Sequence, residues 1–348
     1  MSIASYIRVI GRGKEGARSL TQAQAHDLMC QVLDGRVTDL EVGAFALAMR
    51  IKGESVEELA GFLQATEERC LPVRPPRPAV LLPSYNGARK LPNLTPLLAL
   101  LLAQDGIPVL VHGPLQDPGR VTTAEIFRDL GLPIARDGAD IEHAWSRHGP
   151  VFVATDVLCP ALARLLDVRR VVGLRNPGHT VAKILDPCRM AAGVAADCGA
   201  VGAAALRVVN YTHPEYALLL RRFAAATRAD AMLMRGTEGE PVADPRRLPQ
   251  LDVHIGGVAR PDLSRAAQAG VLTGLPVLPR SCDAATTALY IQSVISGATP
   301  APMPLLEQVE TLVRALAAMT APAAAATPEA TAILPAMPLA HPVEEKTA

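Results

Sequence analysis

Four prolines between residues 72 and 78 (Pro72, Pro75, Pro76 and Pro78) divide the chain into two parts with different hydrophobic patterns. Proline lacks a backbone N–H and its ring blocks a continuing helix, so we expect a stiff linker here. Before the linker, apolar residues recur at helical spacing; after it, short apolar runs alternate with helical segments. The linker therefore predicts a boundary between a helical domain and an α/β domain.

The part before the linker carries start signals of helices. Thr21 with Gln24, and Ser55 with Glu58, have the spacing of a capping box, in which a hydroxyl and a carboxylate or amide bond reciprocally to backbone N–H groups. Another helix is expected over residues 39–51. The apolar positions of these helices exceed what one small bundle can bury, so we expect some of them to form a dimer contact: Leu28, Val32, Phe45, Ala48 and Leu59.

After the linker, the pattern is typical of βαβ units and predicts a mainly parallel central sheet. Strands are expected at 79–82, 109–112, 151–154, 206–209, 231–234 and 251–255, with helices near 94–104 and 122–130. We expect residues 1–73 and about 177–204 to form the helical domain, 79–176 and about 205–320 the α/β domain, and 321–348, rich in Ala, Pro and Thr, a disordered tail.

Composition limits the function classes. Lys and Arg number 34 and Asp and Glu also 34, so the net charge is zero and any electrostatic site must be local. Six cysteines without a C-x-x-C pair indicate reduced thiols rather than disulfides or a zinc site. We find no signal peptide, and the longest apolar run, 97–103, is too short to span a bilayer, so we expect a cytoplasmic protein without a membrane partner.

The segment 19–68, followed in order by motifs up to about residue 320, resembles the anthranilate phosphoribosyltransferase family, also called glycosyltransferase family 3. In that family a G-T-G-G-D loop after the first strand binds the diphosphate of phosphoribosyl pyrophosphate, and an acidic pair carries magnesium. Here the loop reads SYNGARK, residues 84–90, and the acidic pair falls on Glu238 and Glu240. The resemblance implies a nucleoside phosphorylase-like fold, a cleft between the domains, and a homodimer formed through the helical domain.

The SYNGARK loop departs from a diphosphate loop. Bare glycine N–H groups can approach a phosphate closely, whereas Ala88 and Arg89 place Cβ atoms there. Arg89 and Lys90 add two cations, which suits a polyanion. SYNGARK, together with NLTPLLALLL, THPEY and GTEGE, resembles a TrpD-like branch, the YbiB-type proteins, which are regarded as nucleic-acid binders without the biosynthetic activity.

We therefore expect sequence-independent binding of DNA or RNA, with no catalytic residue, no metal and no cofactor. The expected phosphate contacts are Arg89, Lys90, Arg169, Arg170, Arg175, Lys183 and Arg189. The expected vestigial substrate cleft comprises Asn86, Gly87, Asn93, Thr95, His112, Gly113, Arg175, Glu238 and Glu240.

Two alternatives remain open at this stage. The cations between 169 and 189 could form a solvated helical face, and His112 could be a core histidine. The chain could also be a phosphoribosyltransferase that uses phosphoribosyl pyrophosphate and an unknown amine or base, with Mg²⁺ at Glu238 and Glu240. The altered diphosphate loop, which keeps one of the family's three glycines and lacks its carboxylate, disfavours this second alternative, and the zero net charge disfavours nucleic-acid binding.

Overall fold

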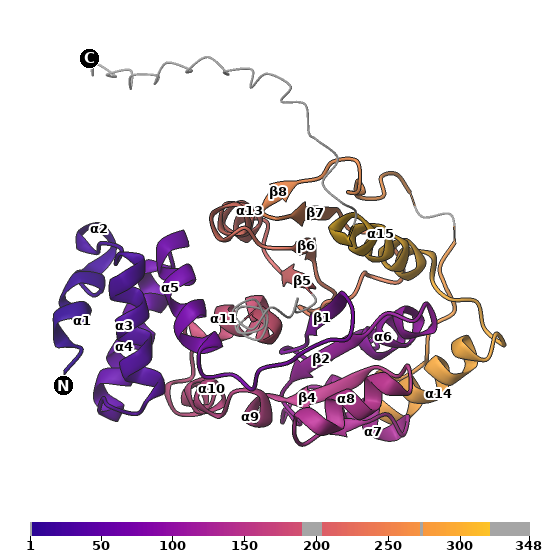
Figure 1. Ribbon diagram of the computed structural model, residues 1–348, viewed down its shortest axis with the longest axis horizontal. Helices are drawn as coiled ribbons and strands as arrows, with labels where there is room; N and C mark the ends of the chain where they lie inside the picture. Colours follow the sequence, from indigo (N-terminus) through magenta and orange to yellow (C-terminus); the bar gives the residue numbers. More distant parts are fainter. Residues whose placement is uncertain (1, 190–203, 272–273, 321–348) are drawn as a thin grey trace, which may run out of the picture.

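The structure is a computed structural model that describes residues 2–189, 204–271 and 274–320. A helical domain lies on one side of a larger α/β domain (Figure 1). The predicted tail 321–348, and residues 190–203 of the predicted segment 177–204, lie outside the described residues.

The N-terminal helical domain begins with two short helices that the sequence patterns did not predict. Its helices are α1 (Ala4–Ile10), α2 (Gly13–Gly16), α3 (Gln22–Leu33), α4 (Asp39–Lys52) and α5 (Val56–Glu67). Both predicted capping boxes are confirmed, Thr21 with Gln24 and Ser55 with Glu58. Each box satisfies backbone N–H groups that the first helical turn leaves unpaired, which explains why α3 and α5 begin where they do.

The α/β domain is built on one eight-stranded sheet in the order β3-β4-β2-β1-β5-β6-β7-β8. The strands are β1 (Ala79–Pro83), β2 (Val109–Gly113), β3 (Ile134–Ala135), β4 (Val151–Ala154), β5 (Ala205–Tyr211), β6 (Ala231–Arg235), β7 (Leu251–Ile255) and β8 (Val258–Ala259). All neighbouring strands from β3 to β6 pair in parallel, whereas β7 and β8 pair antiparallel at one edge. The mainly parallel sheet is confirmed.

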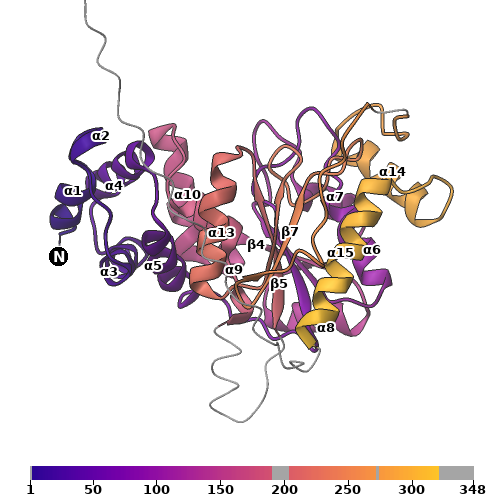
Figure 2. The ribbon, with the colours of Figure 1, turned by 90° about the horizontal axis from the view of Figure 1, so that it is seen from above.

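Helices cover both faces of this sheet, as Figure 2 shows from above. The remaining helices are α6 (Thr95–Gln104), α7 (Thr123–Asp129), α8 (Gly138–Ser146), α9 (Thr155–Leu158), α10 (Pro160–Val172), α11 (Gly178–Ile184), α13 (Glu215–Thr227), α14 (Ala284–Ile295) and α15 (Met303–Thr320). Helices α6, α7, α14 and α15 lie on the face away from the helical domain, and α10, α11 and α13 lie toward it. Among the described residues, no helix is both long and apolar enough to cross a membrane.

Two hydrophobic cores follow from the alternation of side chains along the strands. Val80 and Leu82 of β1 point into the core beneath α6, α7, α14 and α15, whereas Leu81 points into the other core. That second core continues without interruption into the helical domain, where it includes Phe45 and Phe62. The two domains are therefore joined by shared apolar packing.

One sequence expectation about the helical domain is wrong. Leu28, Phe45 and Leu59, expected partly at a dimer contact, are fully buried inside the chain, and Val32 is 8% exposed. Leu28, Val32 and Leu59 are covered because α10, α11 and α13 pack against α3 and α5, and Phe45 of α4 packs edge-on against Phe62. The exposed apolar side chains of this domain lie instead on α4, at Leu40, Leu47 and Ile51.

Candidate functional site

The candidate site is a cleft at the carboxyl ends of β1, β5 and β6. Strand β1 lies between β2 and β5, and the helices that follow β1 and β5 cover opposite faces of the sheet. A crevice opens where the chain connections diverge in this way, and α/β proteins commonly bind ligands there. A cavity of about 440 Å³ lies on the β5 side of this crevice, lined by residues of α4, α11, β5 and α13.

The loop 84–91 after β1 holds a buried carboxylate from the chain itself. Glu240, in the loop after β6, is 1% exposed, and its Oε1 accepts the N–H of Asn86 at 2.7 Å and of Gly87 at 2.6 Å. Its Oε2 accepts the hydroxyl of Ser84. Burial raises the pKa of Glu240, and these hydrogen bonds together with Lys183 oppose that rise. A carboxyl group of the chain itself thus occupies the backbone N–H groups at the start of the loop.

Glu238 likewise accepts backbone N–H groups in the second half of the loop. Its carboxylate accepts the backbone N–H groups of Arg89 at 2.6 Å, Lys90 at 3.0 Å and Leu91 at 3.3 Å. Burial tends to raise the pKa of Glu238, but the three N–H donors outweigh it and lower the pKa. Glu238 adopts φ +53°, a left-handed conformation that costs free energy for a residue with a Cβ. These hydrogen bonds hold it there.

Asn86 connects the loop to the cations of the cleft. Its Nδ2 donates to the carbonyl of Glu238 at 2.9 Å, and its Oδ1 accepts from Nη2 of Arg175 at 2.9 Å. Both ends of the amide are therefore engaged, which fixes its orientation. On the other side of the loop, Arg120 Nη1 donates to the carbonyl of Gly87 at 3.2 Å.

Five cations gather around the cleft: Arg50, Arg120, Arg169, Arg175 and Lys183. Burial lowers the pKa of Lys183 to about 8, and Arg175 and Arg120 lower it further while Glu240 opposes them. Burial also lowers the pKa of Arg175, with Arg169, Arg120 and Arg50 adding to the effect. Among the residues that the structure describes, no ion pair joins any of these five cations to a carboxylate. The cleft therefore holds several cations without an ion-pair partner among the described residues, although Glu54 and Glu215 also line the cavity.

Both histidines of the site are held in their neutral form. Burial lowers the pKa of His112 to about 3, and its Nδ1 lies 3.0 Å from the hydroxyl of Tyr85. Burial, Arg175 and Arg169 lower the pKa of His179 to about 4. Both rings are therefore uncharged at neutral pH and add nothing to the positive charge of the cleft.

Asn93, Thr95 and Gly113 lie behind the loop rather than in the cavity. Asn93 Nδ2 donates to the Thr123 hydroxyl at 2.8 Å, and Asn93 Oδ1 accepts the N–H of Thr95 at 3.1 Å. A Cβ at Gly113 would lie 1.8 Å from the carbonyl oxygen of Ser84, so only glycine allows β1 and β2 to approach so closely here. These residues support the loop 84–91 without lining the cavity.

The predicted phosphate contacts divide into groups in space. Arg175 and Lys183 line the cavity and Arg169 lies near Arg175, whereas the exposed side chains of Arg89 and Lys90 lie on the loop 84–91. Arg170 is exposed and pairs with Asp167 at 3.2 Å. Arg189 lies beside Arg207 and Asp230, near the start of β5 and thus at the end of that strand opposite the cleft.

Sequence reasoning missed Arg50 and Arg120. Arg50 lies in the last turn of α4, and Arg120 lies in the loop between β2 and α7. Neither belongs to a recognisable motif, and only the packing of the two domains brings Arg50 to the cleft. A cation in a helix's last turn is common because it complements the helix dipole, so the pattern offered no specific signal.

The residues present do not fit a magnesium-bound diphosphate in this arrangement. The loop amides that such a group needs already bond to Glu238 and Glu240, and the carboxylate oxygens accept from these amides and, at Oε2 of Glu240, from the Ser84 hydroxyl. Within the described ranges, the only group of three or more potential metal ligands lies elsewhere, at His26, Cys30 and Glu68.

Comparisons with known proteins agree with this fold. Residues 4–70 match the glycosyl transferase family, helical bundle domain. The structure is similar to anthranilate phosphoribosyltransferase from Thermus thermophilus (TM-score 0.62, 19% identity, 87% of this chain and 92% of that one). It is also similar to the Saccharomyces cerevisiae enzyme in complex with PRPP and Mg (TM-score 0.64, 13% identity, 91% and 88%). The chain thus has the fold of these anthranilate phosphoribosyltransferases, with a helical bundle domain of the glycosyl transferase family.

Sequence relatives narrow this class. The chain is 38% identical over 305 residues to YbiB of Escherichia coli (strain K12), covering 87% of this chain and 90% of YbiB. It belongs to the same family as YbiB. The anthranilate phosphoribosyltransferase of Methanopyrus kandleri is 29% identical over 172 residues, and anthranilate phosphoribosyltransferase 2 of Ralstonia nicotianae is 31% identical over 179 residues. These alignments cover only about half of each enzyme, 51% and 52%.

Proposed function

We propose that this protein binds nucleic acid without sequence preference, as a cytoplasmic homodimer, through the positive charge of the cleft. One observation carries the proposal: the protein's own carboxylates occupy the backbone donors of the loop, while the surrounding cations lack carboxylate partners among the described residues. Cations held together at a cost in free energy gain most from an anionic ligand that neutralises several of them at once.

The size of the cavity indicates how a polyanion would lie. A volume of about 440 Å³ can admit a base or a phosphate group but not a duplex. Arg50, on the helical domain, lines the cavity, and the exposed Arg89 and Lys90 lie on the loop 84–91, whose Asn86 bonds to Arg175. A sugar-phosphate backbone passing over the opening would meet cations from both domains, and such contacts give affinity without reading bases.

The test measures binding to unrelated oligonucleotides over a series of salt concentrations. We expect similar affinities for different sequences and a steep loss with salt, with a log–log slope of about 0.9 per phosphate contact on duplexes and about 0.7 on single strands. Arg175→Glu and Lys183→Glu should weaken binding more than the alanine variants, because reversal adds repulsion. Arg136→Glu is the matched control, since Arg136 is exposed, pairs with Asp140 and lies away from the cleft.

Two results would contradict this function. One is a salt-independent affinity, which would remove the electrostatic mechanism. The other is an equal loss of affinity in Arg136→Glu and in the cleft reversals, which would mean that only the net charge matters and that the cleft is not the binding site. Reversals at Arg89 and Lys90 then test the edge of the cleft separately.

A second candidate function is phosphoribosyl transfer, which the relatives named anthranilate phosphoribosyltransferase favour. Turnover with phosphoribosyl pyrophosphate, Mg²⁺ and anthranilate decides between the two. We expect no product above the level of a Glu240→Gln variant, because Glu238 and Glu240 fill the loop where the diphosphate would bind. Product formation that Glu240→Gln abolishes would favour the transferase instead.

A further inference from the structure

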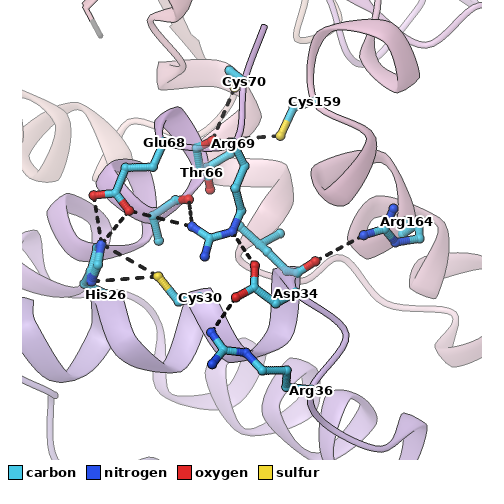
Figure 3. Close-up of polar contacts among 12 residues, drawn as sticks. His26, Cys30, Asp34, Arg36, Thr66, Glu68, Arg69, Cys70, Cys159 and Arg164 are labelled. Atoms are coloured by element: carbon cyan, nitrogen blue, oxygen red, sulfur yellow. Dashed lines mark hydrogen bonds and ion pairs between the residues drawn. The ribbon is translucent and has the colours of Figure 1, made fainter.

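A group of three potential metal ligands of different kinds lies in the helical domain (Figure 3). His26 and Cys30 are one turn apart on α3, so both side chains lie on the same face of the helix. Glu68 follows the last turn of α5, the helix that packs against α3. The structure thus brings an imidazole, a thiol and a carboxylate together from two helices.

The distances within this group are those of ligands around one small ion. His26 Nε2 lies 3.0 Å from both carboxylate oxygens of Glu68 and 3.7 Å from Sγ of Cys30. All three ligand atoms lie within 4.8 Å of one another. With bonds of about 2.0 Å to N and O and about 2.3 Å to S, a tetrahedral zinc ion separates N from O by about 3.3 Å and N from S by about 3.5 Å.

The charges around the group also suit a divalent cation. One thiolate and one carboxylate neutralise two positive charges. The nearby guanidinium of Arg69 is already engaged, because it donates to Asp34 at 2.7 Å and to the carbonyl of Ala65 at 2.7 Å. Its Nη1 lies 3.7 Å from Glu68, and Gln64 donates to the other oxygen of Glu68 at 3.2 Å. These neighbours orient the carboxylate toward His26, as outer partners of metal ligands do.

From these contacts we infer that His26, Cys30 and Glu68 form a site for a zinc-class divalent metal ion, with a fourth position open to solvent. The side chains of His26 and Glu68 are 28% and 32% exposed, so a water or a small external ligand can reach the ion. The sequence patterns predicted no zinc site because they searched for C-x-x-C spacing, whereas two of these ligands are four residues apart and the third is on another helix.

The experiment titrates the full-length reduced protein with Co²⁺, which replaces Zn²⁺ and reports a thiolate ligand by a charge-transfer absorption band. We expect one Co²⁺ per chain with this band. Cys30→Ser should abolish the band, and His26→Ala should weaken Co²⁺ binding about tenfold or more. Absence of the band at saturating Co²⁺ would mean that the group is only an ion pair beside a thiol.

Cys70→Ser is the matched control. Cys70 and Cys159 lie close by, and both thiols donate to the carbonyl of Thr66, at 3.3 and 3.9 Å. We expect Cys70→Ser to keep the band. If the band survives in Cys30→Ser and disappears in Cys70→Ser, the metal binds the Cys70 and Cys159 pair and our assignment is wrong.

A second measurement does not depend on removing the thiol. Zn²⁺ should slow the alkylation of Cys30, followed by peptide mass spectrometry, in the unaltered protein. In Glu68→Gln, which keeps the size of the side chain and loses its charge, the protection should require a higher Zn²⁺ concentration. Alkylation of Cys30 at the same rate with and without Zn²⁺ would overturn the inference even if the other variants failed to fold.

Discussion

Lys183 illustrates how the surroundings set the charge of a single residue. It lies in the last turn of α11, and its ammonium group donates to Oδ1 of Asn210 at 3.0 Å. Burial, aided by Arg175, lowers its pKa to about 8. At neutral pH it is mostly charged, and a small rise in pH removes that charge.

This pKa predicts a pH dependence of nucleic-acid binding. Only the protonated lysine attracts phosphate, so the affinity should fall by about tenfold between pH ~7 and ~9, one unit above the pKa. Lys183→Arg should bind with an affinity that stays nearly constant over this range, because arginine remains charged. Titrations of a fluorescent oligonucleotide at constant ionic strength measure the affinity of both proteins at each pH. If the affinity of the two proteins changed equally with pH, Lys183 would be excluded as a phosphate contact.

Glu67 shows the opposite case, a buried acid. It is 4% exposed, and its Oε1 accepts the N–H of Asp186 at 3.2 Å. Burial raises its pKa from 4.5 to about 8, although Arg207 opposes the rise. The protonated form therefore favours the folded state: its contribution to stability is complete below pH ~4.5 and is lost as the pH rises through ~8.

Glu67→Gln should remove this dependence. Glutamine keeps the acceptor oxygen and cannot ionise, so the free energy of unfolding of the variant should exceed that of the natural protein at pH ~8 by an amount on the order of 2–4 kcal/mol, and match it near pH ~4. Urea unfolding at several pH values is the measurement. Glu57→Gln, an exposed position on the same helix, is the control, and its free energy of unfolding should depend on pH as that of the natural protein does.

At the scale of elements, two loops from neighbouring parts of the sheet hold each other. The loop after β6 contributes Glu238 and Glu240, and the loop after β1 contributes the N–H groups that they accept. Gly239 between the two acids has φ +88°, and a Cβ there would lie 1.8 Å from Nδ2 of Asn86. The contact between the loops depends on this glycine.

Gly239→Ala should therefore separate the loops. We expect a loss of about 2–4 kcal/mol in the free energy of unfolding, because the unfavourable φ adds to lost hydrogen bonds. The control is Gly297→Ala, where φ is +80° and a Cβ would meet nothing within 4 Å; it should cost about 1 kcal/mol. Similar losses in both variants would show that the loop contact contributes little.

The elements themselves could largely be predicted from sequence, and the contacts of the site could not. Apolar runs located β4 and β7 at the bounds that the structure has, and capping boxes located the start of α3. The strands β3 and β8 span only two residues each, too short for a pattern. Nothing local indicates that Glu240 bonds to an amide 154 positions earlier, because only the order of strands brings the two loops together.

At the scale of the whole molecule, the helical domain presents an apolar surface to solvent. Leu40, Leu47 and Ile51 of α4 are exposed by 84%, 46% and 62%. Their spacing of seven and four residues places them along one side of the helix. Ile7 and Ile10 of α1 line a shallow hollow beside Leu47 and Ile51. Exposed apolar side chains gathered in this way favour an interface between two protein surfaces.

We expect this surface to form the proposed homodimer. Leu47→Asp combined with Ile51→Asp should convert a dimer at micromolar concentration into a folded monomer, which sedimentation velocity and circular dichroism can show. The control is Leu289→Asp with Leu306→Asp, two exposed leucines on α14 and α15, on the face away from the helical domain. A dimer that survives the first pair of substitutions would exclude α4 as the interface.

The dimer also predicts how affinity depends on the length of the nucleic acid. A two-fold dimer presents two clefts, and a strand long enough to reach both binds the second cleft at a high effective concentration. The monomeric variant keeps one intact cleft, so it should bind a short oligonucleotide as tightly as one cleft of the dimer. On a long oligonucleotide it should lose about 10²-fold in affinity. Equal losses on short and long oligonucleotides would mean that the substitutions damage the cleft itself, and no loss on either would mean that each cleft acts alone.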